Sequence, residues 1–214
     1  QTYATIDIEF TNIAPHDVAV AMWDEYDNLI EATGQMTWHI QEDQSVELTA
    51  RAEDSIDDLS GLSYQWSFGP STDGRESRVA AVWSEAGMQT ILVKAIDSEG
   101  EDSGWVERWV DVQNMEPQVE ELAEVMSVAE GQSFSLSGNA WDTISDMDNL
   151  VVCWDIDPGA DTDGIGSADD DCDVEGANLT WSWQNAGTYN VVFHATDDDG
   201  ARNSSSASVT VLNL

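Results

Sequence analysis

The feature that most constrains the fold of this chain is a strand-like segment that occurs twice. Residues 62–68 read Leu-Ser-Tyr-Gln-Trp-Ser-Phe, and residues 150–156 read Leu-Val-Val-Cys-Trp-Asp-Ile. In both copies, large apolar residues recur at every second position, which is typical of a β-strand with one buried face. We therefore predict that Tyr64, Trp66 and Trp154 point into the core between packed sheets.

The sequence on either side of this segment repeats as well. Residues 44–70 resemble residues 132–158 at a constant offset of 88, and residues 83–100 resemble residues 183–200 at an offset of 100. A self-similarity of this length indicates two tandem domains of one fold. Because the strands are separated by turn residues and no segment has a helical period, we predict an all-β fold of two antiparallel sandwiches, each of about 100 residues.

The edges of the repeat predict the domain boundaries. Residues 8–15 end in Asn-Ile-Ala-Pro and residues 110–117 end in Asn-Met-Glu-Pro. Proline cannot join a strand ladder, so we expect a joint at 114–117. The expected parts are a closing strand at 1–13, a first sandwich at 14–114 and a second sandwich at 115–214 with an acidic insertion. The closing strand either completes a preceding repeat or joins a sheet edge of a neighbouring molecule, giving head-to-tail self-association.

Two insertions distinguish the repeats. The first unit carries extra residues within 18–41, where we expect strands at 18–22 and 36–40 with a turn at 26–28. The second unit carries extra residues between Trp154 and Ala186.

The charge of the chain limits its partners. It has 43 acidic residues against 6 basic ones, a formal net charge of −37. Such a surface repels nucleic acids and anionic membranes, and no segment has the length of an apolar membrane span, so we expect neither nucleic-acid binding nor membrane insertion. It also repels itself unless cations screen it. Adaptation to salty water and specific binding of divalent cations both remain as explanations.

A longer motif in the second unit points to a family. Trp183 to Gly187 is followed by Gly-x-Tyr-x-Val-x-Phe-x-Ala-x-Asp-x-x-Gly over residues 187–200. This pattern resembles the polycystic-kidney-disease (PKD) domain, and the first unit follows it with Gln89 in the tyrosine position. The family's Trp-Asp-Phe-Gly-Asp-Gly loop is altered in both units. The resemblance implies an immunoglobulin-like β-sandwich in each unit, with Tyr189 and Phe193 in the core of the second.

The resemblance also implies a location and a role. PKD domains occur as spacers or adhesive units in secreted and cell-surface proteins, and beside the catalytic domains of secreted hydrolases. We therefore expect an extracellular or cell-surface protein whose partners are other domains of the same protein, surface glycans or surface proteins.

Cys153 and Cys172 are the two cysteines of the chain. Cys153 precedes Trp154, so it should face away from the core. A disulfide would pin the acidic insertion to the outer face of the sheet, whereas a reducing compartment would leave two free thiols. The extracellular character implied by the PKD resemblance favours the disulfide.

Aspartates crowd the insertion of the second unit and the segment before the central strand. Calcium binds six to eight oxygen ligands, and aspartates at alternate positions of a glycine-bent loop can converge on one ion. The segment before the central strand holds Ca²⁺ in some PKD relatives. We therefore predict a Ca²⁺ site, with merely solvated carboxylates as the alternative. Its candidate ligands are Asp155, Asp157, Asp161, Asp163, Asp169, Asp170, Asp171, Asp142 and Asp146.

The expected function is structural and non-catalytic. The three histidines are scattered and no nucleophile motif is present, so we do not expect an enzyme. The main hypothesis is a spacer or adhesion segment, stiffened by Ca²⁺. One alternative is a carbohydrate-binding accessory module that uses Trp105 and Trp109, although tryptophan more often packs in a core. The other is a self-assembling surface filament that uses residues 1–13.

Overall fold

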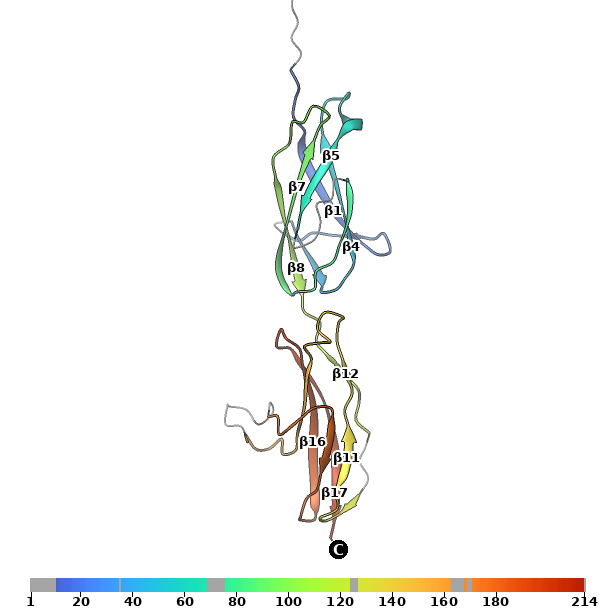
Figure 1. Ribbon diagram of the computed structural model, residues 1–214, viewed down its shortest axis with the longest axis vertical. Helices are drawn as coiled ribbons and strands as arrows, with labels where there is room; N and C mark the ends of the chain where they lie inside the picture. The colour runs from blue at the N-terminus through green and yellow to red at the C-terminus, as the bar shows by residue number, and fades with distance from the viewer. Residues whose placement is uncertain are drawn as a thin grey trace, which may run out of the picture. The chain divides into compact units, whose positions relative to one another are not determined.

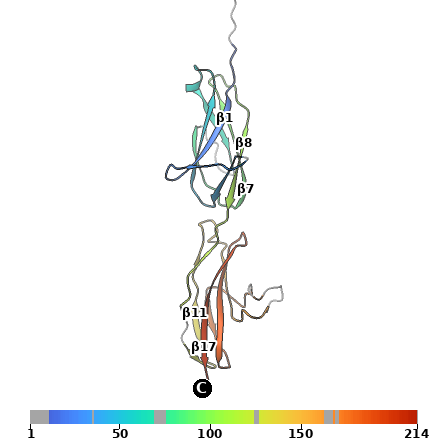
Figure 2. The ribbon, with the colours of Figure 1, turned by 180° about the vertical axis from the view of Figure 1, so that it is seen from behind.

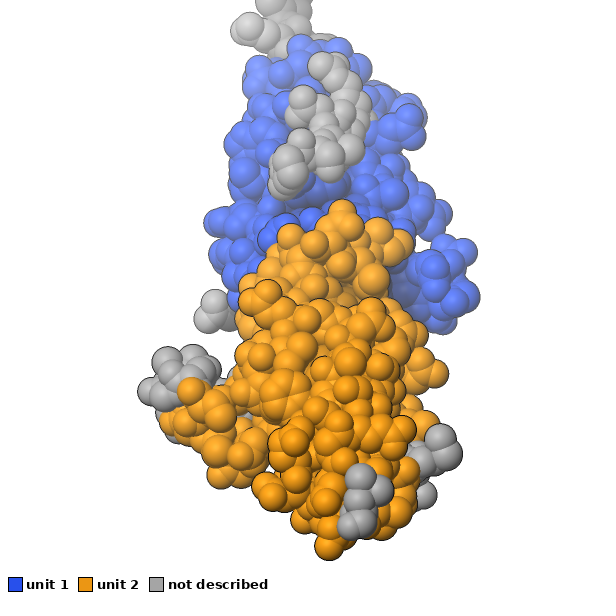
Figure 3. Space-filling view, turned by 60° about the horizontal axis from the view of Figure 1, so that its bottom comes forward, with its two compact units in different colours: residues 1–113 blue, residues 114–214 orange. Residues whose placement is uncertain are grey.

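The computed structural model describes residues 11–34, 36–68, 76–123, 127–162, 168 and 171–213. The chain divides into two compact units, residues 1–113 and 114–214, which are coloured separately in Figure 3. Both units consist of β-strands, and within the described ranges the helical structure is one 3₁₀ turn, η1 (Leu59–Gly61) (Figure 1). The prediction of an all-β fold is confirmed. In this part of the chain, no helix has the length and apolar character needed to cross a bilayer.

The first unit is a sandwich of two four-stranded sheets. In spatial order, one sheet contains β2 (Leu29–Ile30), β1 (His16–Asp24), β4 (Val46–Glu53) and β6 (Arg78–Ala81). The other contains β3 (Thr37–Gln41), β8 (Val106–Gln113), β7 (Gly87–Ile96) and β5 (Ser63–Ser67). Strands β7 and β8 pair antiparallel and lie side by side in Figure 2, whereas β3 joins β8 in parallel.

The segment of the first unit that carries its insertion supplies strands to both sheets. The strand expected at residues 18–22 falls within β1, and the strand expected at 36–40 overlaps β3, which lies one residue later. They do not pair with one another, because the turn after β1 leads into the short strand β2 and the chain then crosses to the opposite sheet. The insertion therefore adds the short strand β2, whereas β1 and β3 have counterparts in β9 and β10 of the second unit.

The second unit repeats this topology, but one of its two layers is divided into two separate strand pairs. Its five-stranded sheet contains β10 (Val128–Ala129), β17 (Arg202–Leu212), β16 (Gly187–Thr196), β13 (Val151–Asp155) and β14 (Val174–Glu175). The facing layer consists of the pair β9 (Gln118–Val119) and β12 (Ala140–Trp141) and the pair β11 (Phe134–Ser137) and β15 (Asn178–Trp181). Strand β10 runs parallel to β17, as β3 does to β8.

The duplicated tryptophans lie at the centre of the two cores. Trp66 and Trp154 are both fully buried, and Tyr64 is also buried. The indole nitrogen of Trp66 donates a hydrogen bond to the carbonyl oxygen of Glu76, at 2.8 Å. The alternation seen in the sequence thus places these rings between the sheets, where burying an aromatic side chain stabilises the fold most.

Phe193 completes the core of the second unit. Its ring is fully buried and its centroid lies 5.0 Å from that of Trp154. A Cβ atom on Gly138 would lie 2.5 Å from three atoms of the Phe193 ring. The repeat offsets place Ala50 at the position of Gly138 and Val93 at that of Phe193. The second unit therefore combines a larger side chain with a smaller one.

Tyr189, also expected in this core, lies at its edge. It is partly buried, and its ring stacks on Trp183 with 4.4 Å between centroids. Its hydroxyl donates to the carbonyl oxygen of Asn185 at 3.1 Å. A tyrosine fits this position because its apolar ring packs while its hydroxyl reaches a polar partner.

Candidate cation sites

A buried carboxylate fastens the entering segment to the first unit. Asp97 follows β7, and its Oδ1 atom accepts hydrogen bonds from the backbone N–H groups of Glu99, Gly100 and Glu101 at 2.7–3.0 Å. Its Oδ2 atom accepts one from Nδ2 of Asn12 at 2.7 Å. Burial raises the pKa of Asp97, but the hydrogen bonds from Asn12 and the backbone outweigh it and hold that pKa below its usual range.

The second unit contains the same contact. Nδ2 of Asn114 donates to Oδ2 of Asp197 at 2.9 Å, and the backbone N–H of Ala201 donates to Oδ1 of Asp197 at 2.7 Å. We call the Asn12–Asp97 and Asn114–Asp197 contacts the linker clasps. They hold the proline-containing segments to the sandwiches that follow.

The sequence contains both motifs of the linker clasp but does not show that they meet. The asparagine belongs to an Asn-x-x-Pro segment and the aspartate to an Asp-x-x-Gly turn, and both recur at offsets close to 100. This shared recurrence is the signal that could have joined them. It does not establish contact, because the two motifs of each unit lie more than 80 residues apart in the chain.

An acidic cluster surrounds the linker clasp of the second unit. Oδ2 of Asp142 and Oδ1 of Asn114 are buried and have no hydrogen-bond partner among the described residues. Asp146 is also buried and accepts a hydrogen bond from the hydroxyl of Thr143 at 2.9 Å. Burial raises the pKa of Asp142, and the negative charges of the neighbouring carboxylates raise it further. We define the linker-end cluster as Asn114, Asp142, Asp146, Asp197 and Asp198.

The first unit repeats part of this cluster. Asp54 stands at the position of Asp142, and its Oδ2 atom is also buried without a hydrogen-bond partner in the described ranges. Asp58 stands at the position of Asp146 and accepts a hydrogen bond from the hydroxyl of Ser55 at 2.5 Å. Figure 1 shows the chain near residue 60 at the end of the unit where the polypeptide enters.

These residues have the chemistry that Ca²⁺ requires. A buried oxygen without a partner is costly, and like charges close together add to that cost. A hard divalent cation would satisfy the oxygens of Asp142 and Asn114 and would neutralise their neighbours. The predicted ligands Asp142 and Asp146 therefore lie near Asn114, Asp197 and Asp198, and Ca²⁺ binding by this group stays a prediction.

The other predicted ligands lie around the disulfide of the second unit. The bond between Cys153 and Cys172 is present, which confirms that prediction. Cys153 faces outward from the sheet, as expected, and so does His194, its neighbour across the strands. Both are nevertheless buried, because the disulfide brings the loop segment that contains Asp171 and Cys172 back to the sheet.

Asp155 lies beneath this loop segment. It ends β13 and has no exposed surface; its Oδ1 atom accepts the backbone N–H of Asp157 at 2.9 Å, while its buried Oδ2 atom has no hydrogen-bond partner within the described residues. Asp171 is equally buried, whereas Asp157 and Asp161 are exposed. The remaining predicted ligands lie outside the described residues: Asp163, Asp169 and Asp170.

The ionisation of Asp155 gives a testable pH dependence. Burial, together with the charges of Asp173, Asp171 and Asp157, raises its pKa to about 6. The unfolded chain keeps the ordinary value of about 3.9, so the folded protein binds this proton more tightly. The stability that the proton adds is fully present below the unfolded value and is lost as the pH rises through about 6.

In a metal chelator, thermal melts should therefore show the second unit becoming more stable as the pH falls from about 6 to about 4. Asp155→Asn should flatten this slope, because the variant cannot titrate there. An equal slope in the wild type and the variant would assign the pH dependence to other carboxylates.

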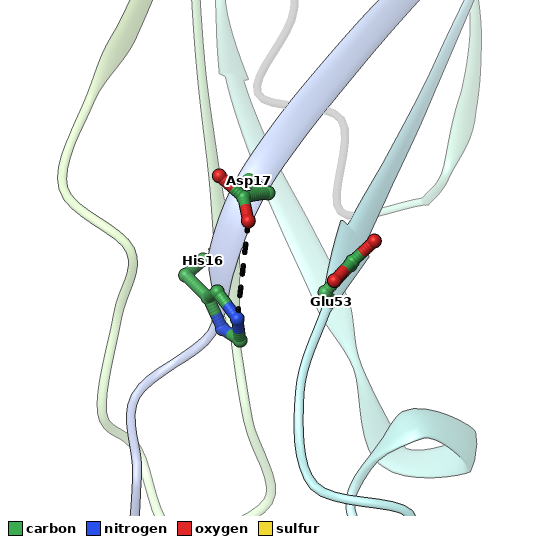
Figure 4. A group of neighbouring side chains, drawn as sticks. All are labelled: His16, Asp17 and Glu53. Carbon is green, nitrogen blue, oxygen red and sulfur yellow. Dashed lines mark ion pairs between the residues drawn. The ribbon is translucent and has the colours of Figure 1, made fainter.

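A third group of candidate ligands lies on the first unit. His16, Asp17 and Glu53 offer ligand atoms that all lie within 4.8 Å of one another, and Figure 4 shows them on β1 and β4. Nε2 of His16 lies 3.9 Å from Oδ2 of Asp17. All three side chains are exposed, so water already solvates them and no buried polar atom is left in need of an ion.

The two tryptophans proposed for glycan contact differ in exposure. Trp105 is 47% exposed, and Nζ of Lys94 lies 5.2 Å from its ring centroid. The same ammonium group donates to Oδ2 of Asp102 at 2.6 Å. Trp109 is half-buried on β8. Trp105 therefore offers the more accessible ring, and a cation–π contact with Lys94 stabilises it.

Comparisons with known proteins bear on the family of the chain. Residues 114–211 match the family model of the PKD domain, which confirms the PKD resemblance for the second unit. No curated protein matches the chain. Many solved structures do match, and the three described next are each 16% identical to the chain.

Three of these structures illustrate the range. The PKD domain of an M14-like peptidase from Thermoplasmatales archaeon SCGC AB-540-F20 is 16% identical over 48% of this chain and 98% of its own, with a TM-score of 0.33. The fibronectin(III)-like modules of Clostridium thermocellum CbhA are 16% identical over 92% of this chain and 95% of theirs, with a TM-score of 0.34. Bacteroides ovatus SGBP-B, solved with a mixed-linkage heptasaccharide, is 16% identical over 85% of this chain and 45% of its own, with a TM-score of 0.31.

Proposed function

We propose, from the PKD-domain match of the second unit, that this chain is a non-catalytic structural segment of an extracellular or cell-surface protein, and that Ca²⁺ at the linker-end cluster stiffens the joint before the sandwich. The observation that carries the proposal is the linker clasp, which occurs in both units and which in the second unit lies near the buried Oδ2 atom of Asp142, an oxygen without a hydrogen-bond partner among the described residues. PKD domains are typically extracellular, where millimolar Ca²⁺ is available and weak sites are filled.

The proposed mechanism is mechanical. Asn114 ties the linker to Asp197, and Asp197 in turn holds the turn after β16. An ion held by Asp142 and the Oδ1 atom of Asn114 would add a second bond from the sandwich to the same linker residue. Spacing then follows from rigidity, because a linker with fewer free dihedral angles keeps its neighbours apart at a defined distance.

Calcium binding itself provides the first test. In calorimetric titrations at high monovalent salt, the wild-type protein should bind Ca²⁺ more tightly than Mg²⁺, since several carboxylates and an amide suit the larger ion. Asp142→Asn should weaken the linker-end site at least tenfold. The matched control is Asp148→Asn, which removes one charge from an exposed position in the same turn.

Two outcomes would refute calcium binding at the linker end. One is an equally weak response to Ca²⁺ and Mg²⁺ that disappears with salt, since this is the behaviour of charge screening. The other is an equal loss of affinity in the Asp142 and Asp148 variants. Either result would leave the structural role without its proposed ion.

A second candidate function is carbohydrate binding, and the exposed ring of Trp105 favours it. An exposed aromatic ring presents a flat apolar face that can stack on a sugar ring. Binding to a glycan array that is lost in Trp105→Ala, or in Trp109→Ala, without unfolding would support an accessory module. An array without signal above that of the Trp105→Ala variant would argue against it.

A further inference from the structure

The second unit contains two Asn-x-Ser/Thr triplets, the acceptor pattern for N-linked glycans when the middle residue is not proline. One is Asn178-Leu-Thr180 on β15, and the other is Asn203-Ser-Ser205 on β17. So short a pattern often occurs by chance, and the triplet alone does not identify a modified residue. The structure separates the two triplets, because side chains at alternate positions of a strand share one face.

The first triplet faces solvent. Leu179 is fully buried between the layers, so Asn178 and Thr180 on either side of it point outward, and both are exposed. The side chain of Asn178 makes no hydrogen bond to any residue in the described part of the chain. The hydroxyl of Thr180 lies 3.1 Å from that of Ser135 on β11. The acceptor amide and the hydroxyl of this triplet therefore lie on the same accessible face.

The second triplet faces inward. Ala207 is buried two positions after it, which places Asn203 and Ser205 on the same inward face of β17. Nδ2 of Asn203 donates to the carbonyl oxygen of Pro117 at 3.0 Å. Oγ of Ser205 accepts the backbone N–H of Leu122 at 2.9 Å. The amide nitrogen that a sugar would join already holds the segment that follows the linker.

The face around Asn178 carries no carboxylate, although the chain has 43 acidic residues in 214. Across the ladder, Ser137 pairs with Asn178 and Ser135 with Thr180, and Ser133, next along this face, is exposed as well. None of the strands β11, β15, β16 and β17 contains Asp or Glu. The carboxylates that hydrate the rest of the surface are thus missing here, and a glycan is a bulky, solubilising substitute for them.

We propose that Asn178 is an attachment site for an N-linked glycan and that Asn203 is not. The donor is an oligosaccharide carried on a lipid pyrophosphate. The amide nitrogen of Asn178 forms a bond to the anomeric carbon of the first sugar and gives up one proton. The bond between that carbon and the pyrophosphate oxygen breaks, and the lipid pyrophosphate leaves with the electron pair. The inference rests on the extracellular placement proposed above and not on Ca²⁺ binding.

The test is to secrete the full chain from a host that attaches N-linked glycans, and to map the modified residues by mass spectrometry of peptides. Release of the glycans by a peptide N-glycosidase in heavy-oxygen water converts each occupied asparagine into a labelled aspartate. Asn178 should carry the label and Asn203 should not. Because the host supplies the export, an unlabelled Asn178 would count against the site and not against the extracellular location.

Variants of the two triplets provide the controls. Thr180→Val keeps the shape of the side chain but removes the hydroxyl that the acceptor pattern requires, so it should abolish the label at Asn178, whereas Thr180→Ser should keep it. Ser205→Ala removes the second triplet and should leave the mass of the attached glycan unchanged. Asn178→Gln should melt at the same temperature as the deglycosylated wild type, because the Asn178 side chain is exposed and makes no hydrogen bond within the described residues.

Three results would overturn the proposal. The first is an unlabelled Asn178 in the folded, secreted wild type. The second is a label at Asn203 equal to that at Asn178, since exposure and hydrogen bonding would then not decide which triplet is used. The third is a label at Asn178 that persists in Thr180→Val, because this would indicate chemical deamidation in place of glycan release.

Discussion

Gly138→Ala is expected to lower the free energy of unfolding of the second unit by about 2–3 kcal/mol, because the new methyl group overlaps the ring of Phe193. A Cβ atom at this position would lie 2.5 Å from three ring atoms. The ring cannot move aside easily, since it is fully buried and packs against Trp154. Without this clash, the same substitution would stabilise the protein by about 0.4–1 kcal/mol through the unfolded chain, so the sign of the effect is diagnostic.

Phe193→Val should rescue Gly138→Ala. The single Phe193→Val change leaves a cavity and is expected to cost about 2–3 kcal/mol. The double variant restores the combination found in the first unit, Ala50 with Val93. Its loss of stability should therefore be much smaller than the sum of the losses in the two single variants. Urea denaturation followed by tryptophan fluorescence measures all four proteins. If the losses of the two single variants simply add in the double variant, the side chains at positions 138 and 193 do not compete for the same space in the core.

Removal of the disulfide is expected to cause the second large loss of stability. Replacing Cys153 and Cys172 with serine should cost the second unit about 3 kcal/mol, because the bond closes a loop across a sequence separation of 19 in the unfolded chain. The variant also releases the segment that covers Asp155 and His194. Burial of these two polar side chains outside the core depends on that cover.

The disulfide experiment has an internal control. Chemical denaturation of the double-serine variant and of the wild type under reducing conditions should show the same loss, confined to the transition of the second unit. The first unit has no cysteine and should unfold at an unchanged denaturant concentration. A loss below about 0.5 kcal/mol, far under the loop-closure expectation, would show that the insertion is held to the sheet without the bond.

The fold was predictable because its signal is local and duplicated. Period-two alternation around Trp66 and Trp154 determines which side chains face inward, and the repeat offset predicts two sandwiches from one pattern. The alignment of the two repeats also pairs Ala50 with Gly138 and Val93 with Phe193. It became meaningful only when the sheets showed that these positions face one another across the core.

The candidate sites were predictable only in part. The spacing of aspartates in the sequence identified the acidic residues of the insertion. It could not distinguish Asp155, which is buried, from Asp157, which is exposed. That difference arises because a segment about 17 residues later returns to the strand. The partnership of Asn114 with Asp197 is likewise a contact between distant parts of the chain.

Relaxation of the backbone amide nitrogens tests the central claim most directly, namely that a cation at the linker end stiffens the joint. With Ca²⁺, the two units should tumble with one shared rotational correlation time. In chelator, and in Asn114→Ala with Ca²⁺, they should show shorter and separate correlation times, because the linker loses its bonds to the second sandwich. Correlation times that are the same in Ca²⁺ and in chelator would contradict the account.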